Sequence, residues 1–155
     1  MKLNGRVAIV TGAASGLGKA IAVRFAQEGA KVAIADLNKQ GADAVAREIE
    51  SAGGRAISVA MDVTSEDDVN NGVAETAAAF GGIDVLVSNA GIQIVHPLEE
   101  FTFADWKKVL RYTSTARFSR PGPACPTCTS QAAAAALSTW GRYCRGKPRN
   151  SRRPM

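Results

Sequence analysis

Long apolar runs are missing from this sequence of 155 residues. No run approaches the ~20 residues needed to span a bilayer, and the N-terminus has no apolar stretch with a small-residue cleavage site after it. The composition, 46% hydrophobic and 21% charged, excludes a disordered or fibrous chain. We therefore expect a soluble, cytoplasmic protein with no membrane partner, of a length that suits one domain.

Acidic residues are absent after residue 110. Residues 1–110 hold all 14 acidic and 10 of the 19 basic residues, a net charge of −4, whereas residues 111–155 hold nine basic residues, a charge of +9. The second part also holds all three cysteines and five of the six prolines, but no Ile or Val. This break predicts a domain over residues 1–110 and an irregular, poorly ordered basic tail over residues 111–155. The overall charge of +5 is thus an average and no sign of nucleic-acid binding.

Strand and helix patterns alternate in the first part. Apolar residues at helical spacing separate short apolar runs that are typical of buried parallel strands. Ser65 with Asp68, and Thr102 with Asp105, have the spacing of capping boxes. The alternation predicts an α/β fold, the N-terminal part of a doubly wound, parallel-sheet Rossmann fold with about four strands. The expected strands are residues 7–10, 31–35, 56–63 and 83–87.

A glycine-rich segment joins the first expected strand to the first helix. Residues 11–18 read Thr-Gly-Ala-Ala-Ser-Gly-Leu-Gly, and such glycines let backbone N–H groups approach a pyrophosphate at a helix N-terminus. Asp36 closes the second strand, 18 residues after Gly18. A carboxylate there accepts the ribose hydroxyls of an adenosine and repels a 2′-phosphate. Together they predict a site for NAD rather than NADP; a tight turn and an ordinary strand-end carboxylate are the alternative.

These motifs resemble the short-chain dehydrogenase/reductase family over residues 1–110. The resemblance adds Asp62-Val63 after the third strand and Asn89-Ala90-Gly91 after the fourth, although Asp62 could also be a solvated strand-end carboxylate. Family members are commonly homotetramers; the oligomeric state of this chain stays open. The resemblance implies that Gly12, Ser15, Gly16, Leu17 and Gly18 hold the pyrophosphate, Asp36 the ribose, Asp62 and Val63 the adenine, and that Asn89, Ala90 and Gly91 support the active-site side of the cofactor.

The segment after the fourth strand resembles the 3-hydroxybutyrate dehydrogenase branch of that family. In this branch a Gln after the Asn-Ala-Gly-Ile turn helps to hold the substrate carboxylate, and Gln93 occupies that position. An amide can donate a hydrogen bond to a carboxylate without carrying a charge itself. A solvent-facing loop Gln is the alternative. His96, the only histidine, is interpreted as a loop residue rather than a catalyst.

The family resemblance also implies a catalytic Ser and a Tyr-x-x-x-Lys helix further along the chain. There the Tyr acts as general acid/base, the Lys lowers its pKa and the Ser orients the carbonyl. Ser130, Tyr143 and Lys147 have family-like spacing. However, no apolar strand precedes Ser130, and the glycines and proline around Tyr143 disfavour a helix. We interpret this spacing as chance, which leaves no credible catalytic residue in the chain.

Two further patterns in the tail are also interpreted as chance. Cys125 and Cys128 have the spacing of a redox pair or half a zinc site, but Cys144 is the only other thiol, so no metal is expected. The arginines could attract phosphates without specificity. Since no aromatic interleaving or known module accompanies them, no specific nucleic-acid partner is expected.

The composition break at Leu110 suggests a change of reading frame. If one base is lost after the Leu110 codon, the genetic code requires Gly at position 141, permits Ser at 142 and requires Tyr, His, Asn or Asp at 155. This order matches the Gly-Ser and the Tyr that the family resemblance implies. One departure is that position 113 becomes His or Tyr where the family usually has Asn. We therefore interpret the tail as translated in a non-native frame.

The expected activity is hydride transfer between NAD and a secondary alcohol, a small hydroxy acid such as 3-hydroxybutyrate. The chain itself is expected to have little or no activity. We also expect a bare outer edge on the fourth strand, which favours aggregation or poor folding. A non-catalytic fragment that binds NAD or anions is the competing hypothesis.

Overall fold

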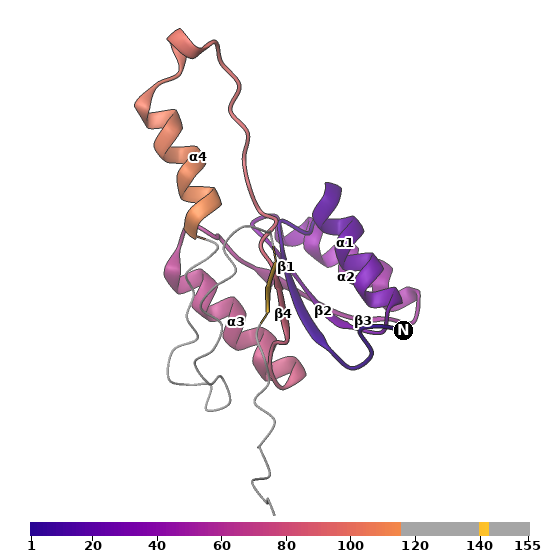
Figure 1. The fold of residues 1–155 in the computed structure, drawn as a ribbon. Coiled ribbons are helices and arrows are strands. Elements are labelled where there is room, and N and C mark those ends of the chain that lie inside the picture. The colour runs from indigo at the N-terminus through magenta and orange to yellow at the C-terminus, as the bar shows by residue number, and fades with distance from the viewer. Residues whose placement is uncertain (116–139, 143–155) are drawn as a thin grey trace, which may run out of the picture.

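The computed structural model of the chain describes residues 1–115 and 140–142. Figure 1 shows the strands side by side in one sheet with helices packed around it. The elements are, in chain order, β1 (Val7–Thr11), α1 (Gly16–Gln27), β2 (Lys31–Asp36), α2 (Lys39–Ser51), β3 (Arg55–Ala60), α3 (Glu66–Phe80), β4 (Val85–Val87), the 3₁₀ helix η1 (Leu98–Glu100), α4 (Phe103–Thr115) and β5 (Trp140–Arg142).

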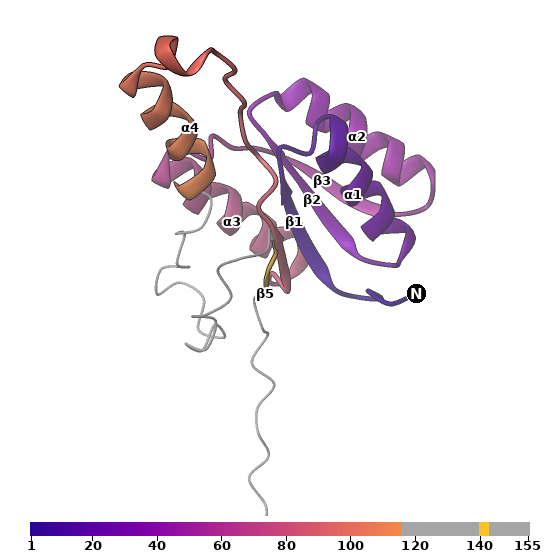
Figure 2. The same cartoon turned by 45° about the horizontal axis from the view of Figure 1, so that its top comes forward.

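The sheet has the strand order β3-β2-β1-β4-β5. The first four strands are parallel: β1 lies between β2, where Val7 is opposite Lys31, and β4, where Ala8 is opposite Val85. Helices α1 and α2 cover one face and α3 covers the other (Figures 1 and 2). The predicted α/β fold with helices on both faces of a parallel sheet is therefore confirmed.

Each face of the sheet carries its own apolar core. Neighbouring residues of a strand point to opposite faces, so Val10 of β1 belongs to the core under α1 and α2 while Ile9 belongs to the core under α3. Burial on both faces explains why the strands read as continuous apolar runs. The buried residues under α1 and α2 are Val10, Ala13, Ala22, Ala30, Val32, Ile34, Ala42, Val45, Ala46, Ile49, Ala56 and Val87. Those of the opposite core are Ile9, Ala33, Ala35, Val59, Met61, Val63 and Val69.

Two helices begin at the capping boxes that the sequence predicts. The Ser65 hydroxyl accepts a hydrogen bond from the backbone N–H of Asp68 at 3.3 Å, at the start of α3. The Thr102 hydroxyl accepts one from Asp105 N at 3.1 Å and donates one to Asp105 Oδ2 at 2.6 Å, just before α4. Both helix starts are thus fixed by local side-chain bonds.

A small part of the predicted tail lies within the described residues. Helix α4 extends to Thr115, five residues beyond the predicted boundary, and Tyr112 packs against the core under α3. Within the described residues, β5 pairs antiparallel with β4, with Gly141 opposite Leu86. The outer edge of β4 is therefore not bare there, contrary to expectation, since the tail supplies a strand for it. The other tail residues lie outside those that the structure describes.

Candidate functional site

The glycine-rich loop between β1 and α1 packs tightly against the turn that follows β4. A Cβ at Gly18 would lie 2.2 Å from the carbonyl oxygen of Gly12 and 2.6 Å from Asn89 Nδ2. Gly12 has a φ of +65°, and a Cβ there would lie 2.9 Å from Ala90 Cα. Both positions need glycine because backbone segments meet there.

The other side of this loop is open. Gly16 has a φ of +56°, and a Cβ on it would meet no atom within 4 Å. Ser15 and Leu17 are exposed, Leu17 by 78%. Ser15 is the N-cap of α1, and among the described residues its side chain makes no capping hydrogen bond. The N-terminus of α1 thus presents N–H groups with no carboxylate in its first turn, an arrangement that suits an anion.

Asp36 lies at the carboxyl end of β2, and its carboxylate is hydrogen-bonded to the glycine-rich loop. Its Oδ2 accepts a hydrogen bond from Ala14 N at 2.9 Å, and its Oδ1 accepts one from Asn38 N at 2.9 Å. A carboxylate has about four lone-pair positions, so these two bonds leave acceptor capacity for a ligand. The side chain is half-buried. The carboxylate and the glycine loop, 22 residues apart in sequence, therefore form one continuous surface.

Asn89, which follows β4, is hydrogen-bonded to the end of β1. Its side-chain Nδ2 donates to the carbonyl oxygens of Thr11 at 3.1 Å and Gly12 at 3.2 Å. The buried Thr11 hydroxyl donates to Val87 O at 3.4 Å and accepts from the backbone N–H groups of Asn89 and Ala90, each at 3.1 Å. The sequence reasoning did not single out Thr11. The sequence feature that could have identified Thr11 is a hydroxyl residue at the end of a buried strand, directly before Gly12.

Asp62 and Val63 follow β3 but point in different directions. Asp62 Oδ1 accepts from the backbone N–H and the hydroxyl of Thr64, both at 2.8 Å. The backbone hydrogen bond and then the hydroxyl bond lower the pKa of Asp62 below its ordinary 3.8, against the opposing effect of burial, and the charge of Arg111 adds to the lowering. Val63 is 5% exposed and packs in the core under α3. Of these two residues, only Asp62 therefore presents a polar side chain at the carboxyl end of β3.

Gly91 and Gln93 lie exposed on the segment that runs from β4 to η1. His96 is exposed on the same segment, its ring centroid 6.5 Å from that of Phe101. Ser130, Tyr143 and Lys147, and likewise Cys125, Cys128 and Cys144, lie outside the described residues. Among the residues that the structure describes, no group of three His, Cys, Asp or Glu side chains could hold a metal ion. In the same part of the chain, no helix has the length and apolar character to cross a membrane.

The chain is similar in sequence to known dehydrogenases. The model of a family described as short chain dehydrogenase matches residues 6–136, which extends 26 residues beyond the predicted limit at residue 110. The 2,5-dichloro-2,5-cyclohexadiene-1,4-diol dehydrogenase LinX of Sphingobium indicum is 47% identical over 119 residues, covering 76% of this chain and 47% of that enzyme. The D-threitol dehydrogenase of Mycolicibacterium smegmatis is 38% identical over 157 residues, covering 94% of this chain and 60% of that enzyme.

A solved structure agrees with these relatives. The 3-ketoacyl-(acyl-carrier-protein) reductase from Brucella melitensis, complexed with NADH, superposes with a TM-score of 0.68 at 40% sequence identity, covering 74% of this chain and 46% of that one. The chain thus spans about half the length of such relatives, 47% in the case of LinX.

Proposed function

The chain belongs to the short-chain dehydrogenase family, and from that premise we propose that residues 1–110 bind NAD for hydride transfer from a secondary alcohol. The observation that carries the proposal is the position of Asp36, whose carboxylate adjoins the glycine loop through Ala14 N at 2.9 Å. Its remaining lone pairs can accept ribose hydroxyls, and its charge repels a 2′-phosphate. The NADH complex of the Brucella reductase supports a nicotinamide cofactor.

The described residues fit such a cofactor. The open side of Gly16 and the N-terminus of α1 suit a pyrophosphate, because the first turn of α1 holds no acidic residue. When bound, NAD supplies the hydride acceptor, and the protein supplies binding and orientation. On this proposal the pyrophosphate lies at Gly12, Ser15, Gly16, Leu17 and Gly18, the ribose at Asp36, the adenine beside Asp62 and the backbone of Val63, and the active-site side at Asn89, Ala90 and Gly91.

A binding measurement tests the cofactor. We expect calorimetric titration to show NAD binding, with NADP at least ~10-fold weaker because of charge repulsion at Asp36. Asp36→Ala should weaken NAD and reduce this discrimination. Equal affinity of the unmodified chain for the two dinucleotides would contradict the assignment to NAD, and no binding of either would contradict the site.

The finer proposal for the substrate is 3-hydroxybutyrate, held by the exposed Gln93. The relatives are named for several alcohols, including a cyclic diol and threitol, and the Brucella reductase for a 3-ketoacyl group, which shares the 3-oxo pattern of oxidised 3-hydroxybutyrate. Saturation-transfer NMR with NAD present can compare 3-hydroxybutyrate with threitol. We expect the hydroxy acid to bind and Gln93→Ala to abolish its signal; binding of threitol alone would overturn this assignment.

Turnover separates an enzyme from a binding fragment. We expect little or no NADH formation from 3-hydroxybutyrate, because the spacing of Ser130, Tyr143 and Lys147 is interpreted as chance. Turnover at ordinary rates that is lost in Tyr143→Phe would contradict this. NAD binding without turnover would support a non-catalytic NAD-binding fragment, and salt-sensitive DNA binding that disappears on deletion of residues 111–155 would support an anion-binding one.

A further inference from the structure

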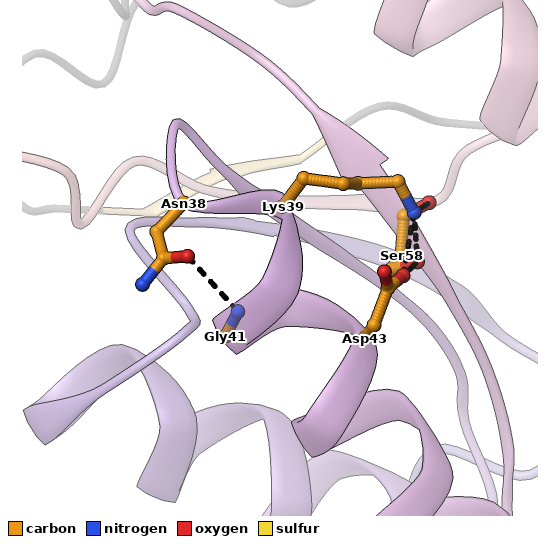
Figure 3. A network of polar contacts seen from close by, with 5 residues as sticks. All are labelled: Asn38, Lys39, Gly41, Asp43 and Ser58. Atoms are coloured by element: carbon orange, nitrogen blue, oxygen red, sulfur yellow. Dashed lines mark hydrogen bonds and ion pairs between the residues drawn. The ribbon is translucent and has the colours of Figure 1, made fainter.

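A closed polar network lies beside the start of α2 (Figure 3). Lys39 Nζ donates to Asp43 Oδ1 at 2.6 Å, to the Ser58 carbonyl oxygen at 3.2 Å, and to the Ser58 hydroxyl. The Ser58 hydroxyl in turn donates to Asp43 Oδ1. A lysine ammonium has three donors, and here all three are used. Lys39 therefore has no donor free for a ligand in this arrangement.

The network begins close in sequence to Asp36, the proposed ribose ligand. Lys39 is the first cationic residue after Asp36, three residues along the chain. The turn between them is closed by the bond from Asn38 N to Asp36 Oδ1 at 2.9 Å. Figure 3 shows the Lys39 side chain extending to Ser58 on β3, away from the side chain of Asn38 and from Gly41. The ammonium is thus anchored on the strand at the outer end of the sheet order rather than at the ribose position.

The network gives the fold little stability. The Lys39 and Asp43 side chains are 46% and 35% exposed, and ion pairs with this exposure contribute little to the free energy of unfolding. The hydrogen bond from Lys39 and then that from Ser58 lower the pKa of Asp43 below its ordinary 3.8. Asp43 is therefore ionised at neutral pH and holds the ammonium as a charge. The network thus fixes the position of the ammonium more than it stabilises the fold.

We propose that Asp43 and Ser58 are specificity-determining residues, which keep the Lys39 ammonium away from the ribose and so deny NADP a cation for its 2′-phosphate. The inference rests on the proposed NAD site. A cation near the ribose is what accommodates a 2′-phosphate in dinucleotide sites, and a lysine is a flexible point charge that can serve this purpose when it is free. Discrimination against NADP then has two parts: repulsion by Asp36 and sequestration of Lys39.

Release of the lysine tests the proposal. The double variant Asp43→Ala/Ser58→Ala removes both side-chain partners, and Asp43→Asn removes the charge alone at constant size. We expect the double variant to lower the Kd of NADP by ~5-fold, the equivalent of one exposed ion pair, with the Kd of NAD within ~2-fold of the parent. Asp43→Asn should give a smaller change in the same direction. Circular dichroism confirms that each variant is folded.

Two control variants test whether the Lys39 ammonium causes the change in NADP affinity. Adding Lys39→Met to the double variant should abolish the gain in NADP affinity. Glu28→Ala releases Arg24 from another i,i+4 ion pair, at the far end of α1, and also removes the contacts of Glu28 with Lys2 N and the N-terminus; it should leave both affinities unchanged. An unchanged NADP affinity in both releasing variants, or a gain that survives Lys39→Met, overturns the inference while NAD binding stands. A parent chain that binds neither dinucleotide overturns the proposed function and this inference together.

Discussion

Asn89 shows how a single amide connects two strand ends. Its Nδ2 group donates to two carbonyl oxygens, those of Thr11 and Gly12, so the position requires a donor. Asn89→Ala removes both bonds and should lower the free energy of unfolding by ~1–2 kcal/mol. Asn89→Asp has the same shape but directs a carboxylate at the two carbonyl oxygens, so it should be more destabilising than Asn89→Ala at pH 7. Urea unfolding of the two variants measures the difference.

The pH dependence of the Asp variant has a defined sign. Carbonyl oxygens disfavour the ionised carboxylate, so its pKa in the folded state is raised above the ~3.9 of the unfolded chain. The penalty is therefore complete above the raised pKa and shrinks as the pH falls from that value through the ~3.9 of the unfolded chain, since a protonated carboxyl can donate one bond. Asn89→Ala serves as the control with no titrating group. Equal stability of the two variants at pH 7 would show that the amide bonds do not determine this position.

At the scale of the elements, the existence of strands and helices was predictable but several of their ends were not. The apolar run at residues 83–87 predicts a strand from residue 83, whereas β4 begins at Val85. Just before this start, the buried Asp84 donates its backbone N–H to Val7 O at 2.8 Å, while its carboxylate accepts from Val7 N at 2.8 Å and from Arg6 at 3.2 Å. Likewise β3 stops at Ala60, opposite the last residue of β2. Such long-range contacts have no local sequence signal.

Two serine N-caps allow the helix starts to be tested against each other. Ser15 and Ser65 both have extended backbone angles before a helix, but only the Ser65 side chain accepts a capping bond, from Asp68 N. Ser65→Ala should therefore lower the free energy of unfolding by ~1 kcal/mol. Ser15→Ala should change it by no more than a few tenths, and Ser65→Asp should preserve the cap. Urea titration measures all three; a similar loss for both alanine variants would refute this account of the caps.

At the scale of the whole molecule, the sequence predicted the parts of the candidate site that local patterns encode. The glycine loop and Asp36 are adjacent in the structure as their spacing implies, because parallel strands end at the same edge of the sheet. The hydrogen bonds of Thr11 with Asn89, and of Lys39 with Ser58, join residues from different parts of the fold, so no periodicity could reveal them. The helical continuation to Thr115 was missed because the composition break was taken as a structural boundary.

The same break motivates the last prediction, which concerns the origin of the tail. We propose that the reading frame changes after the Leu110 codon, since all 14 acidic residues precede it. Resequencing the DNA for residues 108–114 should then reveal one additional base, with the codons for residues 60–66 as an unchanged control. A protein read through the restored frame should gain dehydrogenase turnover that this chain lacks. An unaltered DNA sequence would refute the proposal and make the tail the native continuation of the domain.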